Sequence, residues 1–160
     1  MKNLLIIFFL LVALNGWSKE VDSDNLIHRK GLYYEKSSNE LFTGKSIGVK
    51  QGTIIDGKIE GEWLVFNNGK LWIKSNYKDG KREGEWMRYY GTGELHIKIN
   101  YKNGKTNGEY IFLNQNGTFK KKGNFKYGKK DGQQFEYYKS GELKKIELYK
   151  DGKLLETIEH

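Results

Sequence analysis

The chain has 160 residues, with 28 Lys and Arg against 20 Asp and Glu, so its formal net charge is +8. This length accommodates one domain. The lack of cysteine excludes disulfides and the usual cysteine-containing zinc sites. Proline is also absent whereas glycine is abundant, so turns must be made by Gly, Asn and Asp. The positive charge favours acidic partners or anionic surfaces, although it can also serve solubility alone.

Residues 1–18 have the pattern of a secretory signal peptide. Lys2 precedes an unbroken apolar run over residues 4–14, and the small residues Gly16 and Ser18 lie at positions −3 and −1 before Lys19. The apolar run is short for a transmembrane span, and an uncleaved anchor helix is the alternative. We therefore expect an exported protein, periplasmic or secreted, whose mature chain begins at Lys19.

From Gly57 the chain repeats itself about every 24 residues, which decides the fold class. The expected blocks are residues 57–79, 80–103, 104–127 and 128–151, and a fifth begins at Gly152. End units of repeat arrays are usually atypical. Residues 19–30 are therefore expected as a flexible lead-in, 31–56 as a degenerate N-terminal capping repeat, and 154–160 as a C-terminal cap that folds over the end.

Each block predicts one β-hairpin. In the second block Leu95, Ile97, Ile99 and Tyr101 alternate with His96, Lys98 and Asn100. Alternation over seven residues is a strand signal. Asp-Gly and Asn-Gly pairs between the runs are hairpin turns. The sequence thus predicts an all-β antiparallel hairpin repeat array, a meander of about ten short strands.

Glycines are the fixed points of these hairpins. The first block is shorter by one residue and predicts a two-residue turn at Asn68-Gly69, whereas the other blocks predict three-residue loops that end in a bulge glycine. The repeat-defining glycines are Gly61, Gly69, Gly84, Gly93, Gly108, Gly117, Gly132 and Gly141.

Aromatic residues also recur at two positions of each block. The first strand carries Trp63, Trp86, Tyr110 and Phe135, and the second carries Tyr77, Tyr101, Phe125 and Tyr149. On stacked hairpins these side chains would form ladders that supply burial, and a platform for sugar rings is the alternative.

The fourth block departs from the pattern, because Leu143 and Tyr149 keep the inward positions but Lys145 and Glu147 intrude on them, and Ile146 and Leu148 lie on the opposite face. This predicts a bulge or an altered terminal strand. An open edge at this end would invite pairing with another chain, so self-association through an end strand is expected to be feasible.

The stretch GEWMRYYGTGELHIKINYKNGK resembles the MORN-repeat family in its bacterial variant. The matching residues are Gly84, Trp86, Tyr89, Tyr90, Gly93, Leu95, Tyr101, Gly104 and Lys105. The resemblance implies a β-hairpin scaffold for protein–protein contact, and for many bacterial members an antitoxin- or immunity-like role. Membrane-phospholipid association has been proposed for eukaryotic relatives. The family repeat contains no catalytic residues.

Motifs for chemistry are missing from the sequence. His28, His96 and His160 lack metal-ligand spacing, and neither a nucleophile elbow nor a phosphate-binding loop occurs. We therefore expect no catalytic, cofactor-binding or metal-binding residues, and no enzymatic activity.

Six lysines crowd one predicted hairpin: Lys120, Lys121, Lys122, Lys126, Lys129 and Lys130. They predict a patch for anionic lipid, an envelope glycolipid or an acidic protein, while the expected export disfavours nucleic acid. A solvated face that protects the sheet from aggregation is the alternative.

Three functions are thus carried forward. The first is an exported, non-catalytic repeat scaffold that binds an unidentified protein. The second is a peripheral binder of anionic envelope surfaces, and the third is a glycan binder that uses exposed aromatics.

Overall fold

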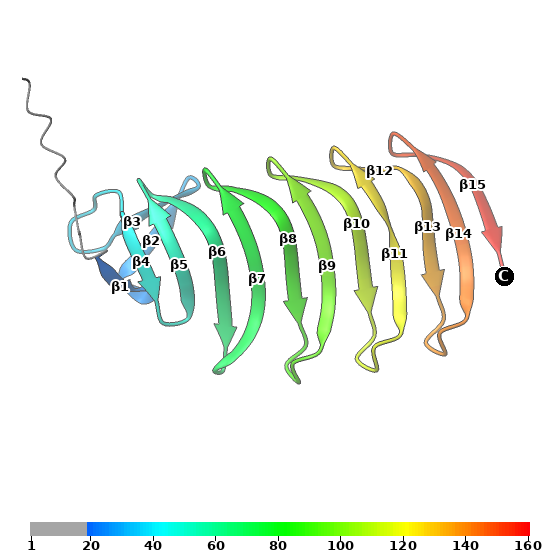
Figure 1. Cartoon of the computed structure of the whole chain (residues 1–160), viewed down its shortest axis with the longest axis horizontal. Helices are drawn as coiled ribbons and strands as arrows, with labels where there is room; N and C mark the ends of the chain where they lie inside the picture. The colour runs from blue at the N-terminus through cyan, green and yellow to red at the C-terminus, as the bar shows by residue number, and fades with distance from the viewer. Residues whose placement is uncertain (1–18) are drawn as a thin grey trace, which may run out of the picture.

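The computed structural model describes residues 19–160 and is built almost entirely from β-strands (Figure 1). One sheet has 13 strands, in the order β1-β4-β5-β6-β7-β8-β9-β10-β11-β13-β14-β15 with β12 beside β11, and β2 and β3 form a second sheet. The strands are β1 (Glu20–Asp22), β2 (Leu26–Arg29), β3 (Leu32–Glu35), β4 (Gly44–Ile47), β5 (Lys50–Ile55), β6 (Lys58–Asn67), β7 (Lys70–Lys78), β8 (Lys81–Tyr89), β9 (Leu95–Lys102), β10 (Lys105–Leu113), β11 (Phe119–Lys126), β12 (Lys129–Lys130), β13 (Gly132–Tyr137), β14 (Leu143–Lys150) and β15 (Lys153–Glu159). The expected signal peptide lies outside the described residues.

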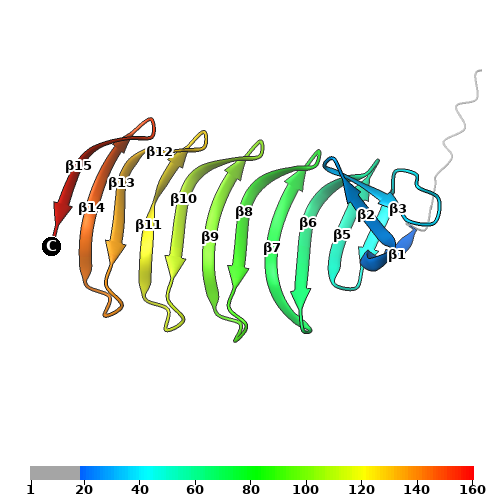
Figure 2. The same cartoon turned by 180° about the vertical axis from the view of Figure 1, so that it is seen from behind.

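The predicted antiparallel meander is confirmed. From β4 to β15 neighbouring strands pair antiparallel in chain order, and the view from behind shows one layer of bowed strands (Figure 2). The predicted number of strands was too low, for two reasons. The N-terminal segment adds short strands, and the fourth repeat divides its first strand into β12 and β13 at Asp131.

Residues 19–30, expected as a flexible lead-in, instead form β1, the 3-10 helix η1 (Ser23–Asn25) and β2. Strand β1 pairs in parallel with β4, and Leu26 of β2 is buried with Phe42 and Trp63 in a small hydrophobic core. A single-layer sheet leaves one end of its apolar face open, and a few apolar side chains in a polar segment suffice to cover it. Their burial stabilises this end of the sheet.

The predicted turns are confirmed. Asn68 and Gly69 form a two-residue turn with φ angles of 49° and 74°, as expected for a hairpin turn of the primed type. In the second repeat the backbone N–H of Gly93 donates to the carbonyl of Tyr90 (2.9 Å), and the N–H of Tyr90 donates to the carbonyl of Glu94 (2.8 Å). This is the expected three-residue loop, with Gly93 at φ 109°.

The repeat-defining glycines of the first strands lie directly opposite the aromatics of the second strands. The pairs are Gly61–Tyr77, Gly84–Tyr101, Gly108–Phe125 and Gly132–Tyr149. All four glycines have positive φ, so the backbone conformation requires glycine at this position.

The sheet has one face on which side chains are buried, which we call the core face. Its central row runs across the strands from Trp63 through Ser75, Trp86 and Ile99 to Tyr110. Large rings thus alternate with smaller side chains, and Trp63 and Tyr110 are only 4% and 5% exposed. The predicted first-strand ladder is therefore present in three repeats.

The placement of Phe135 in that ladder was wrong. Phe135 pairs with Lys122 and Ile146 and lies on the opposite face, while Gln134 holds the buried position, with 4% exposure. In each repeat the side chain in the central row comes two residues after the glycine of the first strand. Counted from Gly132, this residue is Gln134. A phenylalanine one position later points to the other side of the sheet, because side chains alternate along a strand.

The C-terminal cap also differs from expectation. Residues 153–159 form β15, which extends the sheet as its last strand and pairs only with β14. Leu154, Leu155 and Ile158 remain 52%, 62% and 46% exposed instead of folding over the end. A seven-residue strand that continues the backbone ladder satisfies more hydrogen bonds than a folded-back segment would.

Candidate interaction surface

A β-bulge recurs at the same place in all four repeats. In each repeat, one residue of the second strand has no partner on the first strand. In the first repeat this residue lies between Leu71 and Ile73, which pair with Phe66 and Val65. The skipped residues are Trp72, His96, Lys120 and Lys144, spaced 24 residues apart. We call them the bulge row. A bulge bends its strand and re-aims the side chain, and bulges are common next to functional sites.

The bulge also corrects the predicted faces of the second repeat. Leu95 was expected on the same face as Ile97, but it pairs with Tyr89, whereas Ile97 pairs with Arg88. The extra residue, His96, interrupts the alternation that the sequence suggests.

The bulge row lies toward the three-residue loops, on the core face. His96 contacts Arg88, whose side chain is on that face, with 3.2 Å between Nδ1 and Nη2, and its ring stacks on Tyr90 at a centroid distance of 4.1 Å. Burial and the nearby charges of Arg88 and Lys120 lower the pKa of His96. The lowered pKa favours the neutral form of the His96 ring.

The last member of the row has similar surroundings. The Lys144 ammonium donates to Glu136 (3.4 Å) and lies 5.9 Å from the ring centre of Tyr138. Aromatic and cationic groups thus lie together at this edge of the core face, and Trp72 and Tyr138 are 42% and 46% exposed. Exposed Trp, Tyr and Arg are the residue types that most often anchor protein interfaces.

The six lysines of the predicted patch do not form one surface. Lys121 lies on the core face, 3.1 Å from Glu136, while Lys122 lies on the opposite face, 5.0 Å and 5.2 Å from the ring centres of Phe119 and Phe135. Lys130 contacts Glu147 at 3.7 Å. Lys120 belongs to the bulge row, and Lys126 and Lys129 are cross-strand partners at a turn. Strand alternation therefore separates residues that are adjacent in the sequence.

Ion pairs explain the unusual charges of the fourth repeat. Glu136 accepts from Lys121 and Lys144, and Glu147 lies 2.6 Å from Lys145. Burial would raise the pKa of Glu136, but Lys121 and Lys144 hold it below its usual value. Lys145 and Glu147 thus neutralise each other on the core face, where the second repeat places Ile97 and Ile99.

Comparison with known families decides the class of the chain. The family model described as the MORN repeat variant matches residues 59–79, 82–103 and 130–151. The chain is a MORN-repeat protein. The third block, residues 104–127, lies outside the matches but forms the same hairpin from β10 and β11. MORN repeats are generally non-catalytic modules for protein or membrane interaction, and the hairpin array of this chain is compatible with a repeat scaffold.

Other comparisons add little to the MORN assignment. No curated protein matches the sequence. A solved structure, the crystal structure of the GtfA/B complex bound to UDP and GlcNAc, matches with 11% identity and a TM-score of 0.34, over 62% of this chain and 22% of that chain. The MORN chain thus spans about a fifth of that chain, and at this TM-score the likeness carries no argument.

The bulge row is the feature of the MORN array that the sequence analysis missed. An alignment of the four blocks on their loop glycines brings these four residues to one equivalent position, although it does not mark them as bulges. An apolar residue precedes the bulge in every repeat (Leu71, Leu95, Phe119 and Leu143), while the bulge residue itself changes in chemistry. Such a pattern distinguishes positions that hold the fold from positions free to vary.

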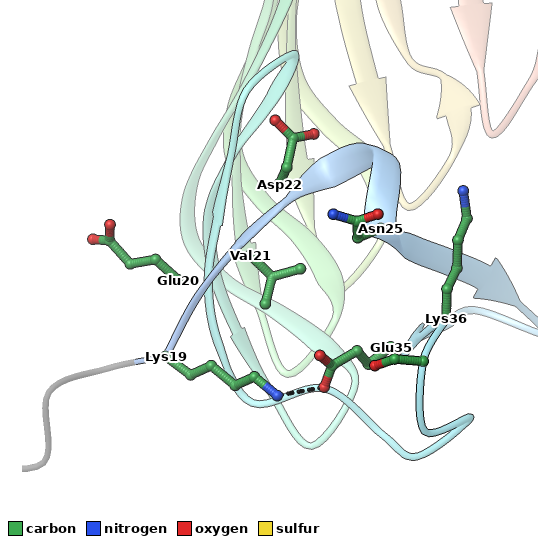
Figure 3. A pocket seen from close by; sticks show the side chains of 8 residues that line it. Lys19, Glu20, Val21, Asp22, Asn25, Glu35 and Lys36 are labelled. Atoms are coloured by element: carbon green, nitrogen blue, oxygen red, sulfur yellow. Dashed lines mark hydrogen bonds and ion pairs between the residues drawn. The ribbon is translucent and has the colours of Figure 1, made fainter.

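A hollow lies at the N-terminal end of the MORN array. Lys19, Asp22, Asn25 and Glu35 are among its lining residues, and the Lys19 ammonium lies 2.5 Å from the Glu35 carboxylate (Figure 3). The hydrogen bond from Lys19 lowers the pKa of Glu35. This contact joins the start of the described chain to β3, so we assign it to the N-terminal cover of the sheet.

Two negative findings apply to residues 19–160. No group of three or more His, Asp or Glu side chains is placed to hold a metal ion. No helix in this range is long and apolar enough to cross a membrane.

Proposed function

We propose that the chain is a non-catalytic scaffold that binds another protein through the bulge row and the aromatic residues beside it, Tyr90 and Tyr138. One observation carries this proposal. The four bulges have the same backbone position but present Trp, His, Lys and Lys, so a constant framework displays a varied set of side chains. Trp72 and Lys120 are exposed and His96 and Lys144 are half-buried, and variation at one such surface position suits recognition of a specific partner.

The framework supports this role because each repeat contacts its neighbours through a continuous ladder. Repeat proteins use such arrays as extended binding surfaces. Tyr90 is held by its hydroxyl, which donates to the carbonyl of Leu113 in the next repeat at 2.8 Å. A fixed aromatic side chain loses little conformational entropy when a partner binds.

The chemistry of the row points to an acidic partner. Arg88 and Lys120 give positive charge to the loop side of the core face, which also carries the exposed rings of Trp72 and Tyr138, while Lys144 is paired with Glu136. The signal-peptide pattern at residues 1–18 favours a partner in the envelope or outside the cell. If the chain has an antitoxin- or immunity-like role, this partner is a toxin.

Affinity capture from an envelope fraction tests the proposal. We would compare the unaltered protein with the double variant Trp72→Ala and Tyr138→Ala at low and high salt. The matched control is Ile55→Ala with Tyr127→Ala, which also removes two exposed apolar side chains but leaves the bulge row intact. An interface centred on aromatics should survive high salt, whereas binding through lysines alone should not.

The expected result is one protein retained at high salt by the unaltered chain and the control, and lost from the bulge-row variant. Equal loss from both variants, or retention only at low salt, would contradict the proposal.

A further inference from the structure

The turns between repeats carry a regular arrangement of lysines on the edge of the sheet opposite the three-residue loops, which we call the turn edge (Figure 1). Each turn has the pattern Lys-x-Gly-Lys, at residues 78–81, 102–105, 126–129 and 150–153. The two lysines of each turn are direct cross-strand partners: Lys78–Lys81, Lys102–Lys105, Lys126–Lys129 and Lys150–Lys153. The turn edge shares no residue with the bulge row.

The four turns are tied to one another. The N–H of Gly104 donates to the carbonyl of Arg82 (2.9 Å), the N–H of Gly128 donates to that of Thr106 (2.8 Å), and the other inter-repeat turns repeat this bond. At three of the four turns a lysine stem packs against the turn glycine, as where a Cβ built on Gly152 would lie 3.3 Å from Cβ of Lys129. A Cβ built on Gly128 would meet nothing within 4 Å. The lysines therefore project from an ordered row of turns.

Like charges placed directly opposite each other on neighbouring strands are destabilising. All eight lysines are exposed, and none of them makes an ion pair within residues 19–160. The arrangement thus costs folding free energy without an internal anion to offset it, which is the pattern expected of a site for an external anion.

The outer turns have an acidic residue between their two lysines, and the two middle turns do not. Asp79 and Asp151 occupy the outer turns, and Glu60 accepts from the backbone N–H of Asp79. The middle turns carry Asn103 and Tyr127 instead. The side chain of Asn107 accepts a hydrogen bond from the backbone N–H of Tyr127. At the preceding turn the carboxylate of Glu83 accepts one from the N–H of Asn103. The carboxylate of Asp131, near Lys129, has a buried oxygen, Oδ2.

The lysines of the two middle turns are thus the ones without a carboxylate between them. They are Lys102, Lys105, Lys126 and Lys129, which we call the central quartet. Successive turns are two strands apart, so the two pairs of the quartet are separated by about 9–10 Å along the sheet. A single small anion cannot reach both pairs. The turn edge is also one lysine pair wide, and so it offers a line of charge and not a plane.

We propose that the turn edge binds an extended linear polyanion, which runs across the repeats and contacts the central quartet. Tyr127 lies between the two lysines of the third turn, is 69% exposed, and offers a ring and a hydroxyl to the same ligand. Each lysine supplies a point charge with three donors. Affinity comes from several such contacts and from the counterions released on binding.

Long-chain inorganic polyphosphate is the probe for the test, with its dissociation constant measured over a range of salt concentrations. The quartet variant carries Lys102→Gln, Lys105→Gln, Lys126→Gln and Lys129→Gln. The matched control carries Lys78→Gln, Lys81→Gln, Lys150→Gln and Lys153→Gln, and has the same net charge. Removal of like-charge pairs should leave both variants folded, which their unfolding midpoints would verify.

We expect the quartet variant to bind at least about tenfold more weakly at low salt. The salt dependence, as the slope of log affinity against log salt, should fall by about one for each lysine that contacts the polymer. The control should lose less than half as much in both quantities. The variant Trp72→Ala with Tyr138→Ala should bind polyphosphate like the unaltered protein, so this test is independent of the protein partner.

Three results would overturn the proposal. Equal losses in the quartet variant and the control would show attraction to net charge only. Competition by orthophosphate as strong as that by polyphosphate, at equal phosphate concentration, would show a single-ion site. Binding to anionic phospholipid vesicles without binding to polyphosphate would show a membrane surface instead.

Discussion

The side chain of Gln134 lies directly against Gly123, in the row that holds aromatic rings in the first three repeats. A Cβ built on Gly123 would lie 2.1 Å from Oε1 of Gln134 and 3.1 Å from Cε1 of Tyr110. The amide of Gln134 donates to the carbonyl of Asn124 at 3.0 Å. The buried row thus ends in a polar group that is accommodated because its neighbour lacks a side chain.

Gly123→Ala should therefore destabilise the protein, because the added methyl group cannot fit between Gln134 and Tyr110 without a shift of the row. We expect a loss of about 1–3 kcal/mol in the free energy of unfolding, the usual cost of overpacking. Urea denaturation would measure it. Gly91→Ala is the control, since nothing lies within 4 Å of a Cβ at Gly91. Equal stability of the two variants would show that Gly123 is not a packing position.

The loop glycines permit a test of backbone conformation alone. Gly93 has φ 109°, whereas Gly91 in the same loop has no positive φ, and a Cβ at either position meets nothing within 4 Å. Gly93→Val should cost roughly 1–2 kcal/mol, because a β-branched residue is strained at positive φ, and Gly91→Val should cost much less. Thermal unfolding of both variants checks this. A larger effect at Gly91 would contradict the assigned loop geometry.

Tyr127 occupies a turn position that Asp or Asn occupies in the other inter-repeat turns. Its φ is 49°, and Tyr tolerates this conformation less well than Asn. Tyr127→Asn should raise the free energy of unfolding by roughly 0.5–1 kcal/mol, since the side chain is mostly exposed and its loss removes little packing. The reverse change, Asn103→Tyr, should lower it by a similar amount. Parallel urea titrations would show whether the two effects have opposite sign.

These glycine and turn positions show which parts of the fold could be predicted from the sequence. The 24-residue period, the turn dipeptides and the loop glycines are local signals, so the hairpins and their order could be predicted. Residue His96 could not be recognised as a bulge, because a single inserted residue leaves the apparent alternation of Leu95–Tyr101 intact. The predicted position of Phe135 was wrong for a related reason. Phe135 resembles Trp86 chemically, but the residue two positions after Gly132, as Trp86 is after Gly84, is Gln134.

The candidate site was harder to predict than the fold. The six lysines were grouped by proximity in sequence, but strand alternation and ion pairs to Glu136 and Glu147 separate them. Cross-strand neighbours such as Lys102 and Lys105 become visible only when the register is known. The N-terminal cover of the core face was missed because Leu26 lies in an otherwise polar segment without periodicity.

Stability should fall at alkaline pH through Tyr110. Burial, with added repulsion from Glu147, raises the pKa of Tyr110 from 10 to about 12. The folded protein thus retains this proton more tightly than the unfolded chain. The resulting stabilisation is complete below pH 10 and is lost as the pH rises through about 12.

Melting temperatures measured across this pH interval would test the role of Tyr110. Tyr110→Phe removes the titrating hydroxyl and should reduce the alkaline loss. Burial also raises the pKa of Tyr33, so part of the loss should persist in the variant. An unchanged profile in Tyr110→Phe would show that Tyr110 does not contribute.

Strand β15 predicts self-association. It is the last strand of the sheet, every residue in it is exposed, and it carries Leu154, Leu155 and Ile158. Unprotected edges pair readily with other strands. Sedimentation of the unaltered protein should show larger species as concentration rises, and Leu155→Lys should suppress them. Leu41→Lys, a matched change of an exposed leucine far from β15 in the sequence, should not. Suppression by both variants would indicate nonspecific hydrophobic association and not pairing through β15.

The central claim is that the loop side of the core face holds the protein partner, and site-specific photocrosslinking tests it most directly. A photoreactive residue would replace Trp72 in the bulge row or, as the control, the exposed Glu109, which pairs with Asn124 on the opposite face. We predict a crosslink to the captured protein from position 72 and none from position 109. Crosslinking from position 109 alone, or equally from both positions, would contradict the account.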